Sequence, residues 1–398
     1  MNTNSGNRAR VRPGLEVLLA ERASEYAGAR LGLVAHPASV TSSLEHAVDA
    51  MLRHGGLELV ALFGPQHGAR GEKQDNMIES DSFLDARTGL PVHSLYGAVR
   101  KPTPAMLEGI DVLFFDLQDV GVRVYTFVWT MVLAMEACRE AGVRFVVLDR
   151  PNPIGGVLRE GPLLRRGYES FIGLHPVPMR HGLTAGELAL YARDRFGVGG
   201  TADVIPCDGW RRELWADETG LPFVPPSPNL PTLDSCTVYP GTVLLEGTNL
   251  SEGRGTTRPF EMVGAPFLDG YALAERLRAF DLPGVIFRPC AFEPTFDKHA
   301  GRLCGGVQLH VVDRAAFRPV ATGIALLRAA WDLAPDDVAW RPPPFEYETE
   351  KPPIDILWGS DALRRGIEAS AGPAEILAGS DAEVRDFAAG AAPYFLYE

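Results

Sequence analysis

The first half of the chain alternates short apolar runs with longer segments in which apolar residues recur at helical spacing. Continuous apolar runs predict buried strands at 30–36, 57–64, 111–117 and 144–149. Between them, the spacing predicts helices at 13–25, 42–54 and 124–141. Strands that are apolar throughout are buried on both faces, as in a parallel sheet covered by helices. The pattern therefore predicts an α/β domain, and such domains bind ligands at the carboxyl ends of their strands.

The second half of the chain has a different pattern of residues, with more proline between its predicted elements. Residues 222–241 are dense in proline and predict an extended connector, because proline lacks a backbone donor and breaks regular helices. Beyond it, the pattern predicts a smaller α+β domain with these elements: a glycine-rich loop at 246–258, helices at 269–280 and 315–332, strands at 284–289 and 306–312, and a proline-rich stretch at 341–353. We expect an N-terminal segment with the first helix over 1–27, the catalytic sheet domain over 28–235, and the smaller domain over 236–398.

Composition narrows the classes of partner. The 398 residues suffice for two domains, and a formal net charge of −13 argues against nucleic acid or an anionic membrane, both of which attract basic faces. The five cysteines are odd in number and include no C-x-x-C pair, so the sequence predicts neither a disulfide framework nor a zinc knuckle. No stretch reaches the roughly 18 apolar residues that span a bilayer, and the N-terminus lacks an apolar signal segment. We expect a cytoplasmic protein that does not insert into membranes.

Several cofactor and catalytic motifs are absent from the sequence. It contains no G-x-G-x-x-G after the first strand, no G-x-x-x-x-G-K-[ST], no G-x-S-x-G and no H-E-x-x-H. This disfavours dinucleotide enzymes, P-loop NTPases, α/β-hydrolases and zincins. We expect neither a cofactor nor a metal ion.

Polar residues gather where the predicted strands end. The stretch FGPQHGARGEKQDNMIES, residues 63–80, follows one strand and combines turning glycines with Gln66, His67, Arg70 and Glu72. The alternative interpretation of this stretch is a solvated loop.

A second cluster, FFDLQDVGVRVYTF, spans residues 114–127 and joins the end of a strand to a helix predicted to begin near Gly121. It supplies polar groups on both sides of the turn: Asp116, Gln118, Asp119, Arg123 and Tyr125. Asp119 is either a site residue or the cap of the helix, a position that Asp favours.

A third cluster, VVLDRPNPIGG, spans residues 146–156 and carries Asp149, Arg150 and Asn152, for which a structural Asx turn is the alternative. It is followed by MRHGLTAGELALYA, residues 179–192. There, Thr184 and Glu187 have the spacing of a capping box, and Arg180 and His181 remain candidate site residues.

The fourth cluster is EGTNLSEGRGTTRPFE, residues 246–261. Its glycines interleave with Glu246, Asn249, Glu252 and Arg254. A loop of this kind offers hydrogen bonds in many directions, together with carboxylates for acid–base chemistry, and no phosphate cradle of known spacing. It indicates recognition of a hydroxyl-rich or amide-bearing small molecule.

Taken together and in order, these motifs resemble the exo-beta-N-acetylmuramidase (NamZ-type) family over residues 28–398. The resemblance rests on GPQHGARGEKQDN, FDLQDVGVRVYT, LDRPNPIGG, EGP, MRHGLTAGELA, PPSPNLP, VYPG and EGTNLSEGRGTTRPFE. It implies a Rossmann-like parallel-sheet domain without a dinucleotide, a smaller α+β C-terminal domain, and a cleft between them. It also implies a hydrolase of cell-wall recycling that releases N-acetylmuramic acid from the non-reducing end of peptidoglycan fragments.

The implied substrate suggests roles for the clustered residues. N-acetylmuramic acid carries a lactyl carboxylate, which Arg70, Arg123 and Arg254 could clamp. Glycoside hydrolysis generally uses two carboxyl groups. We expect Glu72 or Glu252 to act as the general acid, Asp119 or Glu246 as the partner carboxylate, and His67 as a supporting or substrate contact. Further substrate contacts are expected from Gln66, Gln118, Tyr125, Asn229 and Asn249.

Gln66 departs from the family pattern, because many members carry Glu in the corresponding P-E-H-G motif. An amide cannot donate a proton as an acid does, so Gln66 is expected to orient or bind.

Two other functions remain open from the sequence. One is a metal-dependent hydrolase whose ligands would come from His67, Asp75, Asp116, Asp119, Asp149 and His181, although their spacing matches no known ligand motif. The other is a muropeptide-binding protein without activity, which the amide at Gln66 makes plausible. In each case the expected partner is a small molecule, not a nucleic acid, and a homodimer is a further expectation.

Overall fold

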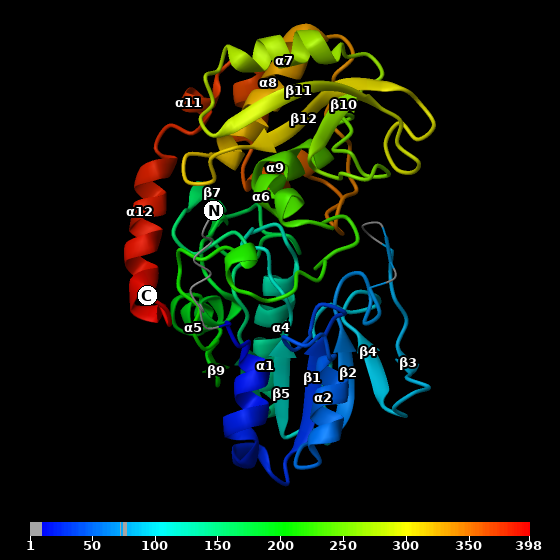
Figure 1. Ribbon diagram of the computed structural model, residues 1–398, viewed down its shortest axis with the longest axis vertical. Coiled ribbons are helices and arrows are strands. Elements are labelled where there is room, and N and C mark those ends of the chain that lie inside the picture. Colours follow the sequence, from blue (N-terminus) through cyan, green and yellow to red (C-terminus); the bar gives the residue numbers. More distant parts are fainter. Residues whose placement is uncertain (1–9, 72, 75–77) are drawn as a thin grey trace, which may run out of the picture.

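The computed structural model describes residues 10–71, 73–74 and 78–398. A seven-stranded sheet forms the lower part of the molecule, and a three-stranded sheet with its helices forms the upper part (Figure 1). This is the predicted combination of a parallel-sheet domain with a smaller α+β region.

The large sheet has the strand order β3-β4-β2-β1-β5-β6-β9. Every neighbouring pair is parallel except β3 and β4. The four strands predicted from apolar runs are confirmed as β1, β2, β5 and β6, and they occupy the centre of the sheet. The strands are β1 (Arg30–Ala35), β2 (Glu58–Gly64), β3 (Phe83–Leu84), β4 (Pro91–Ser94), β5 (Val112–Asp116), β6 (Arg144–Leu148) and β9 (Asp203–Ile205).

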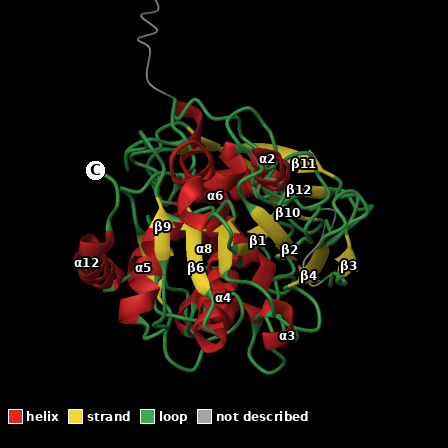
Figure 2. Ribbon diagram, turned by 90° about the horizontal axis from the view of Figure 1, so that it is seen from below, coloured by secondary structure: helices red, strands yellow, loops and turns green. Residues whose placement is uncertain are grey.

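Helices cover both faces of this sheet (Figure 2). One face packs against α3 (Pro104–Leu107), α4 (Phe127–Ala141) and α5 (Ala185–Arg195). The other face packs against α2 (Ala47–His54) and an N-terminal helical segment that runs from α1 (Gly14–Val17) through Leu18–Arg22 and Ala23–Tyr26. Thr184 and Glu187 form the predicted capping box at the start of α5.

The predicted start of α4 is wrong. The helix begins at Phe127, and residues 121–126 form a turn in which Gly121 adopts a left-handed φ of 79°. A side chain at this position would collide with Asn152. The main-chain N–H of Arg123 instead donates to the carbonyl of Met179, which ties the turn to β8 (Pro178–Arg180). Arg123 and Tyr125 therefore precede the helix.

The predicted extended connector is also only partly correct. Its second half forms α6 (Leu233–Thr242), which Thr232 caps by accepting a hydrogen bond from the N–H of Ser235. Pro240 lies in the last turn of this helix, where it removes the N–H that would otherwise donate to the carbonyl of Cys236. A short 3-10 helix, Val243–Gly247, continues the chain into the glycine-rich loop.

The C-terminal region contains the remaining elements. Its antiparallel sheet has the order β10-β12-β11, and α7 matches the predicted helix at 269–280. The elements are β10 (Met262–Ala265), β11 (Val285–Phe292), β12 (Cys304–Val311), α7 (Gly270–Arg278), α8 (Pro319–Leu333), α9 (Pro353–Trp358), α10 (Ala362–Glu368), α11 (Pro373–Ile376) and α12 (Ser380–Ala391).

The C-terminus returns to the large-sheet domain. Helix α12 packs against β7 (Glu160–Leu163), well below the upper sheet (Figure 1). Tyr397 Oη then donates to Asp149 Oδ2 at 2.6 Å. The division at residue 235 stays a prediction, because the final residues of the chain pack on the first domain.

Two further features bear on the expected environment. All five cysteines have free thiols, and four of them are buried. Within the described residues, no helix combines the length and apolar character needed to cross a membrane.

Helices α6 and α8 approach each other so closely that only glycine fits at their contact. A Cβ at Gly323 would overlap the carbonyl oxygen of Gly241. We expect Gly323→Ala to lower the free energy of unfolding by about 3 kcal/mol, because the backbones would have to separate. Gly390 in α12 is a matched control, since its Cβ would meet nothing closer than 3.8 Å. Gly390→Ala should stabilise by about 0.5–1 kcal/mol. Equal effects in urea denaturation would contradict this account.

Candidate active site

Glu346 lies where the two parts of the chain meet, and both parts supply its surroundings. Tyr96 Oη donates to its Oε2 at 2.8 Å, and Gln66 Nε2 donates to its Oε1 at 3.2 Å. Thr126 in turn donates to Gln66 Oε1 at 2.5 Å. Gln66 follows β2, Tyr96 follows β4, and Thr126 precedes α4. The carboxyl end of the sheet thus holds a carboxyl group that comes from some 280 residues further along the chain.

The backbone around this carboxyl group is strained. Glu346, Tyr347 and His67 all have positive φ angles, of 46°, 69° and 72°. Non-glycine residues in this region cost free energy, and in native structures they concentrate at functional sites. Tyr347 is held by Arg100, which stacks over its ring at 3.1 Å, and by Glu79, to which its hydroxyl donates at 3.3 Å. Glu346, the preceding residue in the chain, is only 3% exposed.

The environment of Glu346 favours its protonated form. Burial raises its pKa to about 7, against the opposing effect of the Tyr96 hydrogen bond, and the nearby carboxyl group of Glu246 adds to the rise. A carboxyl group that keeps its proton near neutral pH suits a general acid.

Glu246 belongs to a buried network of charges in the glycine-rich loop. Arg254 donates to Glu246 Oε1 at 2.7 Å, and its Nε lies 3.2 Å from Glu252 Oε1. Lys298 donates to Glu252 Oε2 at 2.8 Å and to two main-chain carbonyls. All three loop residues are buried, so each charge depends on its partners.

The two carboxyl groups of this network have opposite pKa shifts. Burial raises the pKa of Glu246, even though Arg254 opposes the rise. Burial also disfavours ionised Glu252, but Lys298 and Arg254 together lower its pKa. Arg254 Nη1 is buried and has no hydrogen-bond partner. The network therefore presents one unused donor beside two carboxyl groups whose pKa values are shifted in opposite directions.

His67 supports the loop that carries Gln66. Its Nδ1 lies 2.8 Å from the carbonyl oxygen of Lys73, so Nδ1 carries the proton. Asn229 fastens the same loop, because its Nδ2 donates to the carbonyl of Gln74 at 2.6 Å. Glu72 and Asp75 lie outside the described residues, and the predicted role of Glu72 stays a prediction.

Asp119 is buried, and its contacts lie within its own turn and at His181. Its Oδ2 accepts from the N–H of Gly121 at 2.7 Å and lies 3.3 Å from His181 Nε2, whereas Oδ1 has no partner. Asp119 thus caps a turn instead of the helix. Tyr125 donates to the carbonyl of Pro226 at 2.6 Å.

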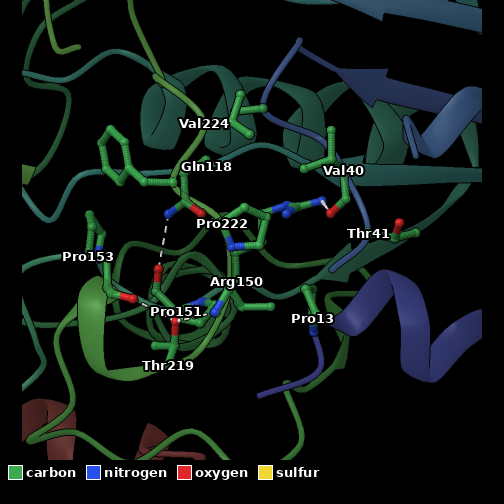
Figure 3. A pocket seen from close by; sticks show the side chains of 14 residues that line it. Pro13, Val40, Thr41, Gln118, Arg150, Pro151, Pro153, Thr219, Pro222 and Val224 are labelled. Carbon is green, nitrogen blue, oxygen red and sulfur yellow. Dashed lines mark hydrogen bonds between the residues drawn. The ribbon is translucent and has the colours of Figure 1, made fainter. Parts of the chain in front are cut away.

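Gln118 lines a small cavity at the carboxyl ends of β1, β5 and β6 (Figure 3). Its Nε2 donates to the carbonyl of Pro151, and Arg150 in the same wall is bound to Asp116 at 2.7 Å. The cavity measures about 50 Å³, well below the several hundred Å³ typical of ligand pockets. Neither Glu346 nor its partners Gln66 and Tyr96 line this cavity, so Gln118 and the Glu346 cluster lie at different places.

The predicted clamp of three arginines is not assembled. Arg123 is fully buried, and its two terminal nitrogens donate to four main-chain carbonyls, those of Pro162, Val177, Leu357 and Trp358. Arg70 is exposed and lies 3.4 Å from Asp85. Only Arg254 joins the charge network. Asn249 is also placed elsewhere, because its side chain bonds the main chain of Asp337 and Ala339.

The predicted metal ligands are likewise used in other ways. Asp116 pairs with Arg150, and Asp149 accepts hydrogen bonds from Thr184 and Tyr397. Across the described part of the chain, no three His, Cys, Asp or Glu side chains are placed to share a metal ion.

Sequence reasoning missed Glu346, Tyr96 and Lys298. Glu346 lies in the stretch at 341–353, which we described only as proline-rich. One signal was available there: an acid between Phe345 and Tyr347, since a carboxyl group flanked by aromatic residues is unusual in a solvated linker.

Comparison with known proteins decides the family. Models of the N-terminal and C-terminal parts of the exo-beta-N-acetylmuramidase NamZ match residues 31–234 and 237–397. The chain belongs to the NamZ family.

A curated member from Bacillus subtilis, peptidoglycan beta-N-acetylmuramidase NamZ, is 47% identical over 364 residues, which cover 92% of this chain and 86% of that protein. Two crystal structures of DUF1343 family proteins from Bacteroides fragilis share the fold. One is 35% identical with a TM-score of 0.88, and the other is 30% identical with a TM-score of 0.77. Each alignment covers 98% of this chain and at least 99% of the other. The predicted NamZ membership, glycosidase class and two-part fold are confirmed.

Proposed function

We propose that this NamZ family protein is an exo-acting glycosidase that releases N-acetylmuramic acid from the non-reducing end of peptidoglycan fragments. The observation that carries the proposal is the 47% identity, over nearly the whole chain, to a relative named for this activity. The buried carboxyl groups of Glu346 and Glu246 supply the pair that glycoside hydrolysis generally requires.

In the proposed mechanism, Glu346 is the general acid. It donates its proton to the glycosidic oxygen as the bond to the sugar breaks, and Gln66 and Tyr96 hold it in place. Water supplies the hydroxyl that bonds to the anomeric carbon, and its remaining proton restores Glu346. Glu246 is the second carboxyl group, because it lies near enough to raise the pKa of Glu346. Burial raises the pKa of Glu246 and Arg254 opposes that rise; in its ionised form Glu246 suits the positive charge that develops on the sugar ring.

Arg254 also fits the lactyl carboxylate of the substrate. Its Nη1 is the unused donor of the network, and a guanidinium binds a carboxylate well. Since Glu346 is only 3% exposed, substrate entry requires a local rearrangement, and we propose that it involves the adjacent Tyr347, which Arg100 and Glu79 hold. Gln66 therefore orients the acid, the role expected from its amide.

The function is tested with the disaccharide N-acetylmuramyl-β-1,4-N-acetylglucosamine. Mass spectrometry should detect free N-acetylmuramic acid and N-acetylglucosamine in equal amounts. An absence of both products between pH 5 and 8 would leave only binding, the alternative that calorimetry with the same disaccharide would reveal.

The pH dependence of kcat/KM should reflect the ionisation of Glu346. Because the pKa of Glu346 is raised to about 7, the group is protonated below that pH and loses its proton above it. We expect kcat/KM to fall about ten-fold per pH unit above pH 7. Circular dichroism at each pH separates this loss from unfolding. A constant kcat/KM up to pH 9 would contradict the assignment.

We also propose a cytoplasmic location and action on muropeptides. The five free thiols support a reducing compartment. Cell fractionation tests the location, and sedimentation of the purified protein tests the expected homodimer.

A further inference from the structure

A second, larger groove lies far from Glu346 along the sheet. It is bounded by residues 154–158, 212–218 and 311–315 and has a volume of about 680 Å³. Its first two walls follow β6 and β9, whereas the residues that hold Glu346 follow β2 and β4. These pairs of strands lie on opposite sides of β1 and β5 in the sheet order. The groove is therefore distinct from the candidate active site.

The wall of this groove contains a buried cation, Arg180, whose nearest carboxyl group hydrogen-bonds elsewhere. Arg180 is only 2% exposed, and its Nη2 donates to the carbonyl of Ile154 at 2.6 Å. Its Nε has no hydrogen-bond partner, and no carboxylate of the described chain lies within ion-pair distance. Glu160, opposite Arg180 across the β7–β8 hairpin, interacts with it electrostatically, but the Glu160 oxygens accept from the N–H groups of Val320 and Ala321.

The other charged groups of the groove are already committed. Arg212 pairs with Glu187 at 2.5 Å, and Arg314 pairs with Asp217 at 2.9 Å. The acidic side chains of the wall are also bound: Glu213 by Arg211, Glu218 by the N–H of Trp215, and Asp313 by the N–H groups of Ala315 and Ala316. An incoming carboxylate would thus find one guanidinium that makes no ion pair and keeps an unused donor, that of Arg180.

Beside this charge, the groove offers an apolar surface. Trp215 lies between Arg180 and Arg314, whose guanidinium carbons are 5.4 and 5.0 Å from its ring centre. Val157 and Val312 are 58% and 64% exposed. Large exposed apolar side chains next to an unpaired buried cation are typical of a ligand site.

We propose that this groove binds a short acidic peptide, with a carboxylate at Arg180 and an apolar side chain against Trp215 and Val312. The volume is too large for a simple carboxylate ion, and peptidoglycan fragments carry peptides with free carboxylates. The choice of a peptide therefore rests on the proposed function. The position of the groove on the other side of β1 and β5 places the bound peptide away from the scissile bond, on another part of the fragment or on a separate peptide.

Calorimetry with the tripeptide Ala-Glu-Ala, acetylated at its N-terminus and amidated at its C-terminus, tests the proposal directly. The protein should bind it, and should bind the uncharged Ala-Gln-Ala with the same blocked ends at least about ten-fold more weakly. Val312→Glu should weaken binding of the acidic peptide by a similar factor, because it adds a like charge at an exposed position. Leu303→Glu, at a site that is 68% exposed and outside the groove, should not. Arg180→Gln should abolish binding of the acidic peptide. If Arg180→Gln does not fold, Val312→Glu still tests the proposal.

Hydrolysis of the peptide-free disaccharide by the same proteins separates the two proposals. Val312→Glu should leave it unchanged. If the protein hydrolyses the disaccharide but binds neither tripeptide, or binds both equally, the groove proposal is overturned. If it binds Ala-Glu-Ala selectively without hydrolysing sugar, the proposed function fails, and the groove then binds free peptides. If Val312→Glu raises KM for a disaccharide that carries a peptide, but not for the peptide-free disaccharide, the bound peptide is part of the fragment.

Discussion

Glu346→Gln should lower kcat on the muramyl disaccharide by about 10²- to 10⁴-fold, the range observed when a general acid is removed. Glutamine matches the size of the glutamate and can still accept a hydrogen bond from Tyr96, so the fold should persist. What it lacks is an acidic proton for the leaving oxygen. Steady-state kinetics measures the loss, and thermal unfolding checks that the variant is intact.

Glu160→Gln is the matched control for this variant. Glu160 is also a buried carboxyl group, and burial raises its pKa to about 7 as well, but it binds the N-terminal N–H groups of α8 and lies away from Glu346. Its replacement should leave kcat within a few-fold of the original. If both variants lose activity equally, burial of a carboxyl group, not its place in the site, explains the effect.

Arg254→Met should destabilise the protein by about 3–5 kcal/mol, the cost of leaving a buried charge without its partner. Without the guanidinium, Glu246 and Glu252 share only Lys298 as a nearby cation. Activity should also be lost, because Arg254 is the proposed ligand of the lactyl carboxylate. Urea denaturation at neutral pH measures the first effect.

The destabilisation should have a defined pH dependence. Protonation of the two carboxyl groups removes the unpaired charge, so the difference between Arg254→Met and the original protein should shrink at pH 4.5. Arg276→Met is the control, because its ion pair with Asp332 at 2.6 Å is partly exposed and should contribute less than about 1 kcal/mol. A destabilisation no larger than that of the control would show that the network is not a stabilising element.

The strands were predictable because burial on both faces leaves an unbroken apolar run, as in β5. Short edge strands such as β3 and β9 carry little of this signal, so they were missed. Helix α6 was not predicted, because Pro231 precedes it and Pro240 lies inside it, although Thr232 provides an ordinary N-cap. Local pattern thus determined the centre of the sheet and left its margins undefined.

The site was harder to predict than the fold. A polar residue that binds main-chain groups has the same local sequence as one that faces a ligand, which is why Arg123 and Asn249 were expected to be ligands. Glu346 was missed for the opposite reason. Its partners Gln66 and Tyr96 lie some 250 to 280 residues away, and periodicity carries no information on which distant loops meet.

The most direct test of Glu346 as the general acid compares two leaving groups. The proton is needed when the leaving group is a sugar hydroxyl, and it is scarcely needed when the leaving group is an activated phenol such as 2,4-dinitrophenol. Values of kcat/KM for Glu346→Gln should therefore fall by at least about 100-fold on the disaccharide and by less than about ten-fold on the dinitrophenyl muramide. An equal loss on both substrates would contradict the account, because it would show that Glu346 acts in some way other than by protonating the leaving oxygen.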